Sequence, residues 1–330
     1  MCTAMTLQTA QGETLFGRTM DFSYLLDPHL YYVPQGYRWR SLRGTAELRA
    51  RYGLLGIGQM APSLVLVDGV NERGLAGAAL YFPGYAHFTP AAAAPSQPTP
   101  VAAIELLPYL LGNCADVDAL PAAVSAVRIV GVEDPVTRSV APLHWIFCDR
   151  SGKCAVLEQT RSGTRFYPNP IGVLANSPDF PWHLTNLRNY VGVTPQQQED
   201  AQWGETALTP FGQGGGTAGL PGGFTPPARF VRVAFLKTHT PRPQSREEAV
   251  VTGFHILESV SIPKGVVRTQ RQTDDFTQYI AFCNTATGEY FIRTYDNSEI
   301  VAARLREARA EGGGPTSQGK LLRPVTFFRL

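Results

Sequence analysis

Short segments in which apolar residues alternate with polar ones, or run together, dominate the chain. Ten such segments, bounded by Gly, Asp, Asn or Pro, predict β-strands at residues 3–9, 13–20, 52–58, 63–70, 76–82, 143–149, 153–159, 172–176, 278–284 and 289–296. Apolar residues at helical spacing predict helices at residues 101–114, 116–127, 183–191, 228–239 and 247–260. Few helices and many hairpins favour an α+β fold over a doubly wound parallel sheet.

Two stretches of low complexity interrupt this pattern. Residues 89–100 (TPAAAAPSQPTP) predict an extended loop or a linker. Residues 212–227 are rich in Gly, but they lack the GK[ST] ending of a phosphate-binding loop and do not show the GxGxxG spacing after a strand. Nucleotide binding is therefore not indicated. No break in composition divides the chain, so we expect residues 1–330 to form one domain.

Composition narrows the class of partner. With 330 residues, of which 44% are hydrophobic and 17% charged, the chain can bury a substantial core. Lys and Arg are scattered and the net charge is +2, which indicates neither a nucleic acid nor a membrane surface as partner. The N-terminus lacks the pattern of a secretory signal, and no window approaches the roughly 18 apolar residues of a membrane span. We therefore expect a cytoplasmic protein.

The cysteines are odd in number, and their spacing matches no metal site. Neither a CxxC pair nor a Cys/His cluster with ligand spacing occurs among the five. We therefore expect no disulfide framework and no bound metal. Four of them lie in apolar or mixed segments, where buried and inert thiols are expected: Cys114, Cys148, Cys154 and Cys283.

Cys2 differs by its position. Met1 is readily removed when the next residue is small, and Cys2 would then begin the mature chain. An α-amine has a reference pKa of about 7.7–8.0 and a thiol one of about 8.5, so near neutral pH the amine can take the thiol proton, directly or through a water. This hypothesis requires no histidine, metal or organic cofactor. The alternative is that Met-Cys-Thr is only a chain start.

Arg18 and Asp21, in the segment LFGRTMDF, belong to the strand or turn that should follow a hairpin from the first strand. An arginine there can favour the thiolate of Cys2, and an aspartate can hold its amine. Taken alone, the two residues could equally form an ordinary surface ion pair.

Longer motifs in order along the chain resemble one known family, the choloylglycine hydrolases, which include bile salt hydrolases and penicillin V acylases. The resemblance runs from Cys2 to about residue 300 and rests on MCT, LFGRTMDF, DGVNERGL, LHWIFCDRSG, GVLANSPDFPWH, LTPFGQG, GLPGGFTPPARFVRVAF and FHILESVSIPKGV. It implies the N-terminal nucleophile hydrolase fold, a four-layer αββα sandwich of two antiparallel sheets between helix layers. It also implies a homotetramer.

The resemblance further implies roles for individual residues. Cys2 would be the nucleophile and, through its amine, the base, with Arg18 and Asp21 beside it. Asn176 would donate its amide hydrogens to the oxyanion, and Arg229 would support the amine. A preorganised oxyanion donor is commonly worth about 3–4 kcal/mol.

Without the resemblance, two of these residues have ordinary explanations. Asn176 fits a turn before Pro178, and Arg229 fits a pairing residue at the start of a helix that follows two prolines.

One position separates the branches of the family. Bile salt hydrolases usually carry an Asn before the FP dipeptide, whereas this chain has Tyr81, which resembles the penicillin V acylases. In those enzymes the backbone N–H of this residue serves the oxyanion hole and its ring lines the acyl pocket, where it suits stacking on a phenoxyacetyl group. Four neighbours could enclose such a group, although each could equally be core packing: Met20, Phe22, Phe82 and Tyr85.

The sequence thus predicts a cysteine amidohydrolase that acts on a small-molecule amide. The favoured substrate is penicillin V, which would give 6-aminopenicillanic acid. The alternative is a bile acid conjugated to glycine or taurine, and a third possibility is an N-acyl homoserine lactone. A non-catalytic binding protein is disfavoured because the whole set of expected catalytic residues is present.

Overall fold

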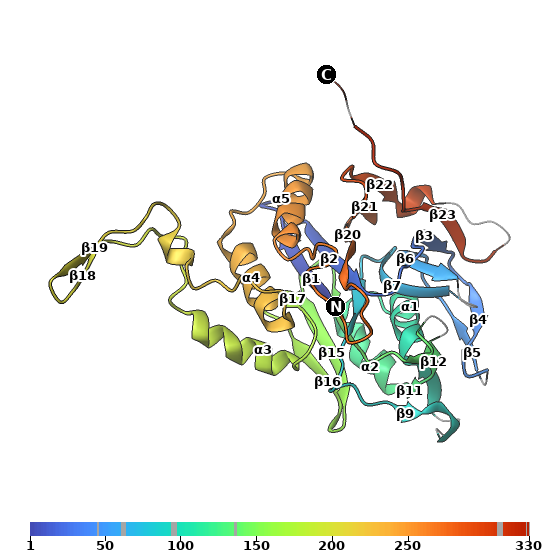
Figure 1. Cartoon of the computed structure of the whole chain (residues 1–330). Coiled ribbons are helices and arrows are strands. Elements are labelled where there is room, and N and C mark those ends of the chain that lie inside the picture. Colours follow the sequence, from blue (N-terminus) through green and yellow to red (C-terminus); the bar gives the residue numbers. More distant parts are fainter. Residues whose placement is uncertain are drawn as a thin grey trace.

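Two antiparallel sheets stacked between helices make up the body of the molecule (Figure 1). The computed structural model describes residues 1–44, 46–60, 64–93, 98–134, 137–308, 313–327 and 329. The expected fold class is confirmed: the protein is an α+β sandwich whose two main sheets are antiparallel throughout.

The first sheet begins with a hairpin that contains the chain start. Its strand order is β17-β1-β2-β20-β21-β22. The strands are β1 (Cys2–Gln8), β2 (Thr14–Phe22), β17 (Val173–Leu174), β20 (Phe276–Asn284), β21 (Glu289–Thr294) and β22 (Val301–Arg304). Thr9 N–H donates to Glu13 O at 3.0 Å in the β1–β2 turn, where Gly12 has φ +86°, a conformation that favours glycine. This turn fixes the register of the hairpin.

The second sheet has the order β16-β15-β14-β8-β7-β6-β3-β23. Its strands are β3 (His29–Val33), β6 (Leu54–Met60), β7 (Leu64–Asn71), β8 (Ala76–Tyr81), β14 (Leu143–Cys148), β15 (Cys154–Thr160), β16 (Gly163–Pro168) and β23 (Thr316–Lys320). Smaller sheets are made by β4 (Arg38–Arg40), β5 (Glu47–Arg49), β9 (Thr89–Pro90), β10 (Thr99–Ala102), β11 (Val127–Gly131), β12 (Glu133–Asp134), β13 (Ser139–Val140), β18 (Ala201–Trp203) and β19 (Thr206–Leu208).

Helices cover the outer faces of the two sheets. Against the first sheet pack α4 and α5, and against the second packs α1. The helices are α1 (Ala103–Asn113), α2 (Leu120–Ser125), α3 (Phe180–Asn186), α4 (Pro226–His239) and α5 (Arg246–Glu258). Strand β14 shows how the core divides: Ile146 and Cys148 join the cluster between the sheets, while Trp145 and Phe147 join the cluster under α1. A strand buried on both faces accounts for its nearly continuous apolar sequence.

The predicted elements match the observed ones with a few informative exceptions. Every predicted strand overlaps an observed one, although Ser63 lies outside the described residues. Helix α3 starts at Phe180, earlier than predicted, because the Asp179 side chain accepts from Trp182 N–H and caps the helix. The stretch 89–100 was expected to be a loop, but it contains β9 and the start of β10, both parallel to β11; residues 94–97 lie outside the described part.

Candidate active site

Cys2 is the first residue of β1 and borders a cavity between the two sheets. In the β1–β2 hairpin Cys2 faces Met20, and Ala4 faces Arg18. Side chains diagonal to one another across a strand pair lie on the same face and within reach of a long side chain. The register therefore brings the Arg18 guanidinium to the Cys2 thiol.

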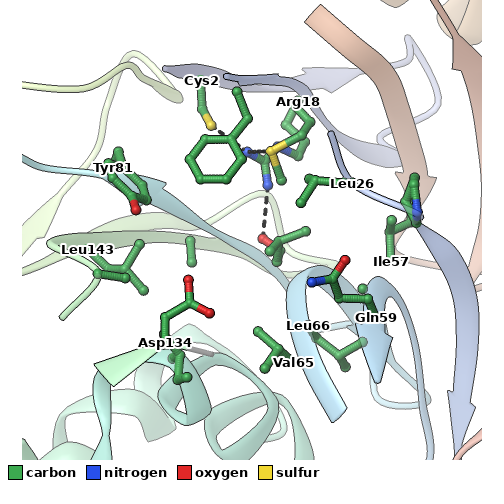
Figure 2. A pocket seen from close by; sticks show the side chains of 18 of the residues that line it. Cys2, Arg18, Leu26, Ile57, Gln59, Val65, Leu66, Tyr81, Asp134 and Leu143 are labelled. Carbon is green, nitrogen blue, oxygen red and sulfur yellow. Dashed lines mark hydrogen bonds between the residues drawn. The ribbon is translucent and has the colours of Figure 1, made fainter. Parts of the chain in front are cut away.

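Arg18 contacts the sulfur directly. Its Nη2 lies 2.7 Å from Cys2 Sγ, and both side chains are almost completely buried (Figure 2). Burial lowers the pKa of Arg18, yet its electrostatic interactions with Cys2, Tyr279, Asp68 and Asp21 together raise that pKa above the usual arginine value. A fixed positive charge against a sulfur favours the thiolate, which is the nucleophilic form.

Asp68, which sequence analysis did not single out, holds Arg18 in place. Its Oδ2 lies 3.6 Å from Arg18 Nη1 and is buried. The carboxylate also accepts hydrogen bonds from the hydroxyls of Tyr279 (2.7 Å) and Tyr290 (3.0 Å). A signal was present in the sequence, because an aspartate inside the apolar run LVLVDGV needs a buried partner.

Asn176 lies at the centre of the hydrogen-bond network. Its Oδ1 accepts from Cys2 N–H at 2.8 Å and from Arg229 Nη2 at 2.7 Å. Its Nδ2 donates to the backbone carbonyl of Tyr81 at 2.7 Å. One side chain therefore joins the start of β1, the end of β8 and helix α4.

Arg229 and Asp21 complete the network around the chain start. Arg229 Nη1 donates to Cys2 O at 2.6 Å and lies 3.7 Å from Asp21 Oδ2. The Asp21 carboxylate also accepts from the hydroxyls of Thr19 (3.0 Å) and Thr277 (2.6 Å). All the catalytic residues expected from the sequence, namely Cys2, Arg18, Asp21, Tyr81, Asn176 and Arg229, thus lie in one connected site.

Met1 occupies the place next to this network. Its carbonyl accepts from Asp21 N–H at 3.0 Å, and its amino group lies 3.3 Å from the Asp275 carboxylate. With Met1 in place the Cys2 nitrogen is an amide, which cannot take a proton. Removal of Met1 would turn the same nitrogen into an amine beside Asn176 Oδ1.

Two buried histidines, which sequence analysis did not use, fix the backbone around Asn176. His144 Nε2 donates to Ala175 O at 2.9 Å, and His183 Nε2 donates to Asn176 O at 2.8 Å. Burial lowers the pKa of His183 to about 4, so that ring is neutral at neutral pH. The His144 ring also stacks on Phe82, with centroids 4.2 Å apart. These contacts fix the backbone carbonyl groups of Ala175 and Asn176, and with them the position of the Asn176 side chain.

The end of β8 has a backbone N–H that can reach the cavity. Phe82 N–H donates to Pro142 O toward β14, and because alternate N–H groups of a strand point to opposite sides, Tyr81 N–H points toward β7. Strands β7 and β8 pair at Ala78 and before it, while the carbonyl of Val67 accepts from Arg18 Nη1 at 3.0 Å. The two strands thus separate after Ala78, and Val67, Ala79 and Tyr81 line the cavity there.

The cavity wall is mostly apolar. Met20, Phe22 and Tyr81 line it, as the sequence led us to expect, together with Leu26, Pro28, Ile57, Val65, Leu66, Val67, Ala79, Ile104, Ala141 and Leu143. Phe82 and Tyr85 do not line it. Successive residues of a strand face opposite sides, so Phe82 turns away from Tyr81 and is buried against His144, and Tyr85 is partly exposed and stacks on Phe82.

The other four cysteines differ from Cys2 in their surroundings. Burial raises the pKa of Cys114 and of Cys154 to about 12, and raises those of Cys148 and Cys283 well above the usual range, so these thiols stay protonated near neutral pH. Among the residues that the structure describes, no group of three or more His, Cys, Asp or Glu side chains could hold a metal ion. No helix in this same part of the chain is long and apolar enough to cross a membrane.

Comparison with known proteins agrees with this geometry. Residues 2–317 match the model of linear amide C–N hydrolases, choloylglycine hydrolase family. A bile salt hydrolase/transferase of Clostridium perfringens is 35% identical over 94% of this chain and 94% of that protein. One from Lactiplantibacillus plantarum is 33% identical over 92% of each.

Solved structures show the same architecture. A mutant of the conjugated bile acid hydrolase from Clostridium perfringens superposes with a TM-score of 0.91 over 100% of both chains, at 32% identity. Penicillin V acylase from Agrobacterium tumefaciens has a TM-score of 0.75 over 93% of this chain and 87% of its own, at 20% identity. At that identity the likeness to the acylase concerns the fold.

Proposed function

Because the chain belongs to the choloylglycine hydrolase family of linear amide hydrolases, we propose that it cleaves the amide bond of bile acids conjugated to glycine or taurine, with Cys2 as the nucleophile. The observation that carries the proposal is the 2.7 Å contact between Arg18 Nη2 and Cys2 Sγ at the edge of an apolar cavity. A thiol held against a guanidinium, beside a slot for an apolar acyl group, suits acyl transfer.

The reaction can be written with the residues in place once Met1 is removed. The Cys2 amine takes the thiol proton, and Sγ attacks the amide carbonyl. The oxyanion accepts hydrogen bonds from Tyr81 N–H and from the Asn176 Nδ2 hydrogen not engaged with Tyr81 O. The amine then protonates the leaving nitrogen, the C–N bond breaks, and a thioester remains. Water hydrolyses the thioester, which releases the acid and restores the thiol.

Our expectation of penicillin V as the favoured substrate rested on Tyr81, and the comparisons support the alternative better. Relatives at 33–35% identity over more than nine-tenths of the chain are named bile salt hydrolases/transferases, whereas the penicillin V acylase is 20% identical. Penicillin V remains a second candidate because Tyr81 does line the cavity, with its ring in a T-shaped contact with the Phe22 ring.

Hydrolysis of glycocholate, taurocholate and penicillin V by the purified protein, measured side by side, tests the substrate. We expect a higher kcat/KM for the two conjugated bile acids than for penicillin V. The ratio of the kcat/KM values of two substrates is set by the difference in how tightly their acyl groups are bound in the transition state. N-acyl homoserine lactones belong in the same panel. Faster turnover of penicillin V, or of a lactone, would contradict the proposal.

Asn176→Ala is expected to lower kcat by about 10²- to 10³-fold with a smaller change in KM, because an oxyanion donor acts mainly in the transition state. Asn169→Ala is a matched control: Asn169 is also buried and also bonds two backbone groups, Val173 O at 3.0 Å and Gly172 N–H at 2.7 Å. Steady-state kinetics of both variants should show the fall in kcat for Asn176→Ala and not for Asn169→Ala. An unchanged kcat in Asn176→Ala would reduce Asn176 to a turn residue.

We also propose that the protein forms a homotetramer. Residues 191–217, between α3 and α4, form an arm that extends away from the body of the molecule and carries the β18–β19 hairpin (Figure 1). The arm exposes Val191, Trp203 and Phe211. Exposed apolar side chains on a projecting arm suit contact with another copy. Light scattering should give a tetramer mass for the wild type and a smaller mass for Trp203→Ser/Phe211→Ser; a monomeric wild type would refute it.

A further inference from the structure

One carboxylate interrupts the apolar wall of the cavity. Asp134 lines it on the side away from Cys2, near Leu143 and Val65 (Figure 2). Its carboxylate points toward the other side chains that line the cavity (Figure 2). The acyl carbonyl must meet Cys2, so the end of an acyl group remote from the amide bond extends toward Asp134.

Local structure holds Asp134 in this orientation. Strand β12 pairs Asp134 with Ser139 and Glu133 with Val140. Because side chains alternate along a strand, Glu133 is exposed, whereas Asp134 is half-buried and faces the cavity. Thr137 Oγ1 donates to Asp134 Oδ2 at 3.0 Å. A carboxylate has two oxygens and about four acceptor sites, so it can accept a hydrogen bond from a ligand in addition to those from the protein.

Occupation of the cavity gives this carboxylate a role in selection. An acyl group that fills the cavity displaces water from Asp134, and a charged group that loses water without gaining a hydrogen bond opposes binding. The loss of water from Asp134 therefore makes an unfavourable contribution to the binding free energy of a wholly apolar acyl end. A hydroxyl at the same place donates a charge-assisted hydrogen bond, which is stronger than a neutral one.

We propose that Asp134 accepts a hydrogen bond from a hydroxyl at the remote end of the acyl group, so that the protein selects hydroxylated acyl groups over wholly apolar ones. This inference rests on the proposed function in that it places the acyl group in this cavity. It adds the class of acyl group: an apolar body with a polar, hydrogen-bond-donating end.

The test compares glycine conjugates that share the steroid skeleton and differ in hydroxyl groups: glycocholate, glycodeoxycholate, glycolithocholate and the conjugate of unsubstituted cholanic acid. For the wild type we expect kcat/KM to be about 10- to 100-fold higher for the best hydroxylated conjugate than for the unsubstituted one, as for one hydrogen bond to a charged group. In Asp134→Leu this ratio should fall to near one, mainly because the unsubstituted conjugate is hydrolysed faster.

Two further variants separate the hydrogen bond to the acyl group from effects of negative charge and of a disturbed fold. Asp134→Asn keeps an accepting oxygen and should retain part of the ratio. Glu133→Gln removes the same charge from the neighbouring exposed residue and should leave the ratio unchanged. A wild-type ratio near one, or the wild-type ratio in Asp134→Leu, would overturn the inference.

A second pair of substrates keeps the inference distinguishable from the proposed function. If the wild type hydrolyses no bile acid conjugate, the proposed function fails. The role of Asp134 is then tested with two N-acylglycines that have the same linear acyl chain and differ only in a hydroxyl group at its end. Preference for the hydroxylated chain in the wild type, lost in Asp134→Leu, supports the role of Asp134. Equal rates refute it.

Discussion

Cys2→Ser and Cys2→Ala are each expected to lower amide hydrolysis by at least about 10³-fold while the protein still folds, because the reaction loses the atom that bonds to the acyl group. Serine and alanine are also small, so removal of Met1 should proceed as in the wild type. The rate is measured on glycocholate, and folding by thermal unfolding followed by circular dichroism.

Cys283→Ala is the matched control for the nucleophile. Cys283 is buried in the same core cluster, on the strand that pairs with β2, but its thiol does not line the cavity. This variant should keep kcat within a few-fold of the wild type, at a stability cost typical of a small core truncation. Substantial hydrolysis by Cys2→Ala would remove Cys2 from the mechanism.

Arg18→Met is expected to lower kcat by about 10²- to 10³-fold and to destabilise the fold by about 3 kcal/mol. The rate falls because no positive charge then holds the sulfur as thiolate. The stability falls because Asp68 remains buried and loses its cation, and breaking a buried ion pair from one side is strongly destabilising. Steady-state kinetics and urea unfolding measure the two effects.

The double variant Arg18→Met/Asp68→Asn separates these two effects. Neutralising Asp68 removes the unpaired charge, and an asparagine there can still accept from Tyr279 and Tyr290. Stability should therefore recover in large part while kcat stays low. Recovery of both would mean that Arg18 acts only through the fold, and wild-type kcat in the single variant would contradict its role at the sulfur.

The arrangement of strands could be predicted because it follows from local patterns. Alternating and continuous apolar runs located the central strands of both sheets, and the β1–β2 hairpin alone places Arg18 near Cys2. Four strands of the two main sheets were missed: β3, β16, β22 and β23. Strands β18 and β19 were missed too, because their residues are all exposed and so carry no burial pattern.

The rest of the site depends on contacts between segments far apart in the chain. Asn176 lies 174 positions from Cys2, and Arg229 lies 227 positions from it, so no local pattern could place them; only the resemblance to a family did. Asp68 and His144 make buried polar contacts that a sequence shows only as polar residues within apolar runs. Phe82 was misplaced because adjacency to Tyr81 in the chain means opposite faces in a strand.

The central claim is that the active protein begins with Cys2 and uses its thiol, and mass spectrometry of the active enzyme tests it most directly. The purified protein is weighed intact, treated with less than one equivalent of iodoacetamide, digested and mapped, while glycocholate hydrolysis is followed in parallel. We predict a mass that lacks Met1, modification at Cys2 ahead of the four buried or protonated thiols, and loss of activity in proportion to that modification. Full activity with Met1 retained, or activity that stays unchanged as the modified fraction of Cys2 rises, would contradict the account.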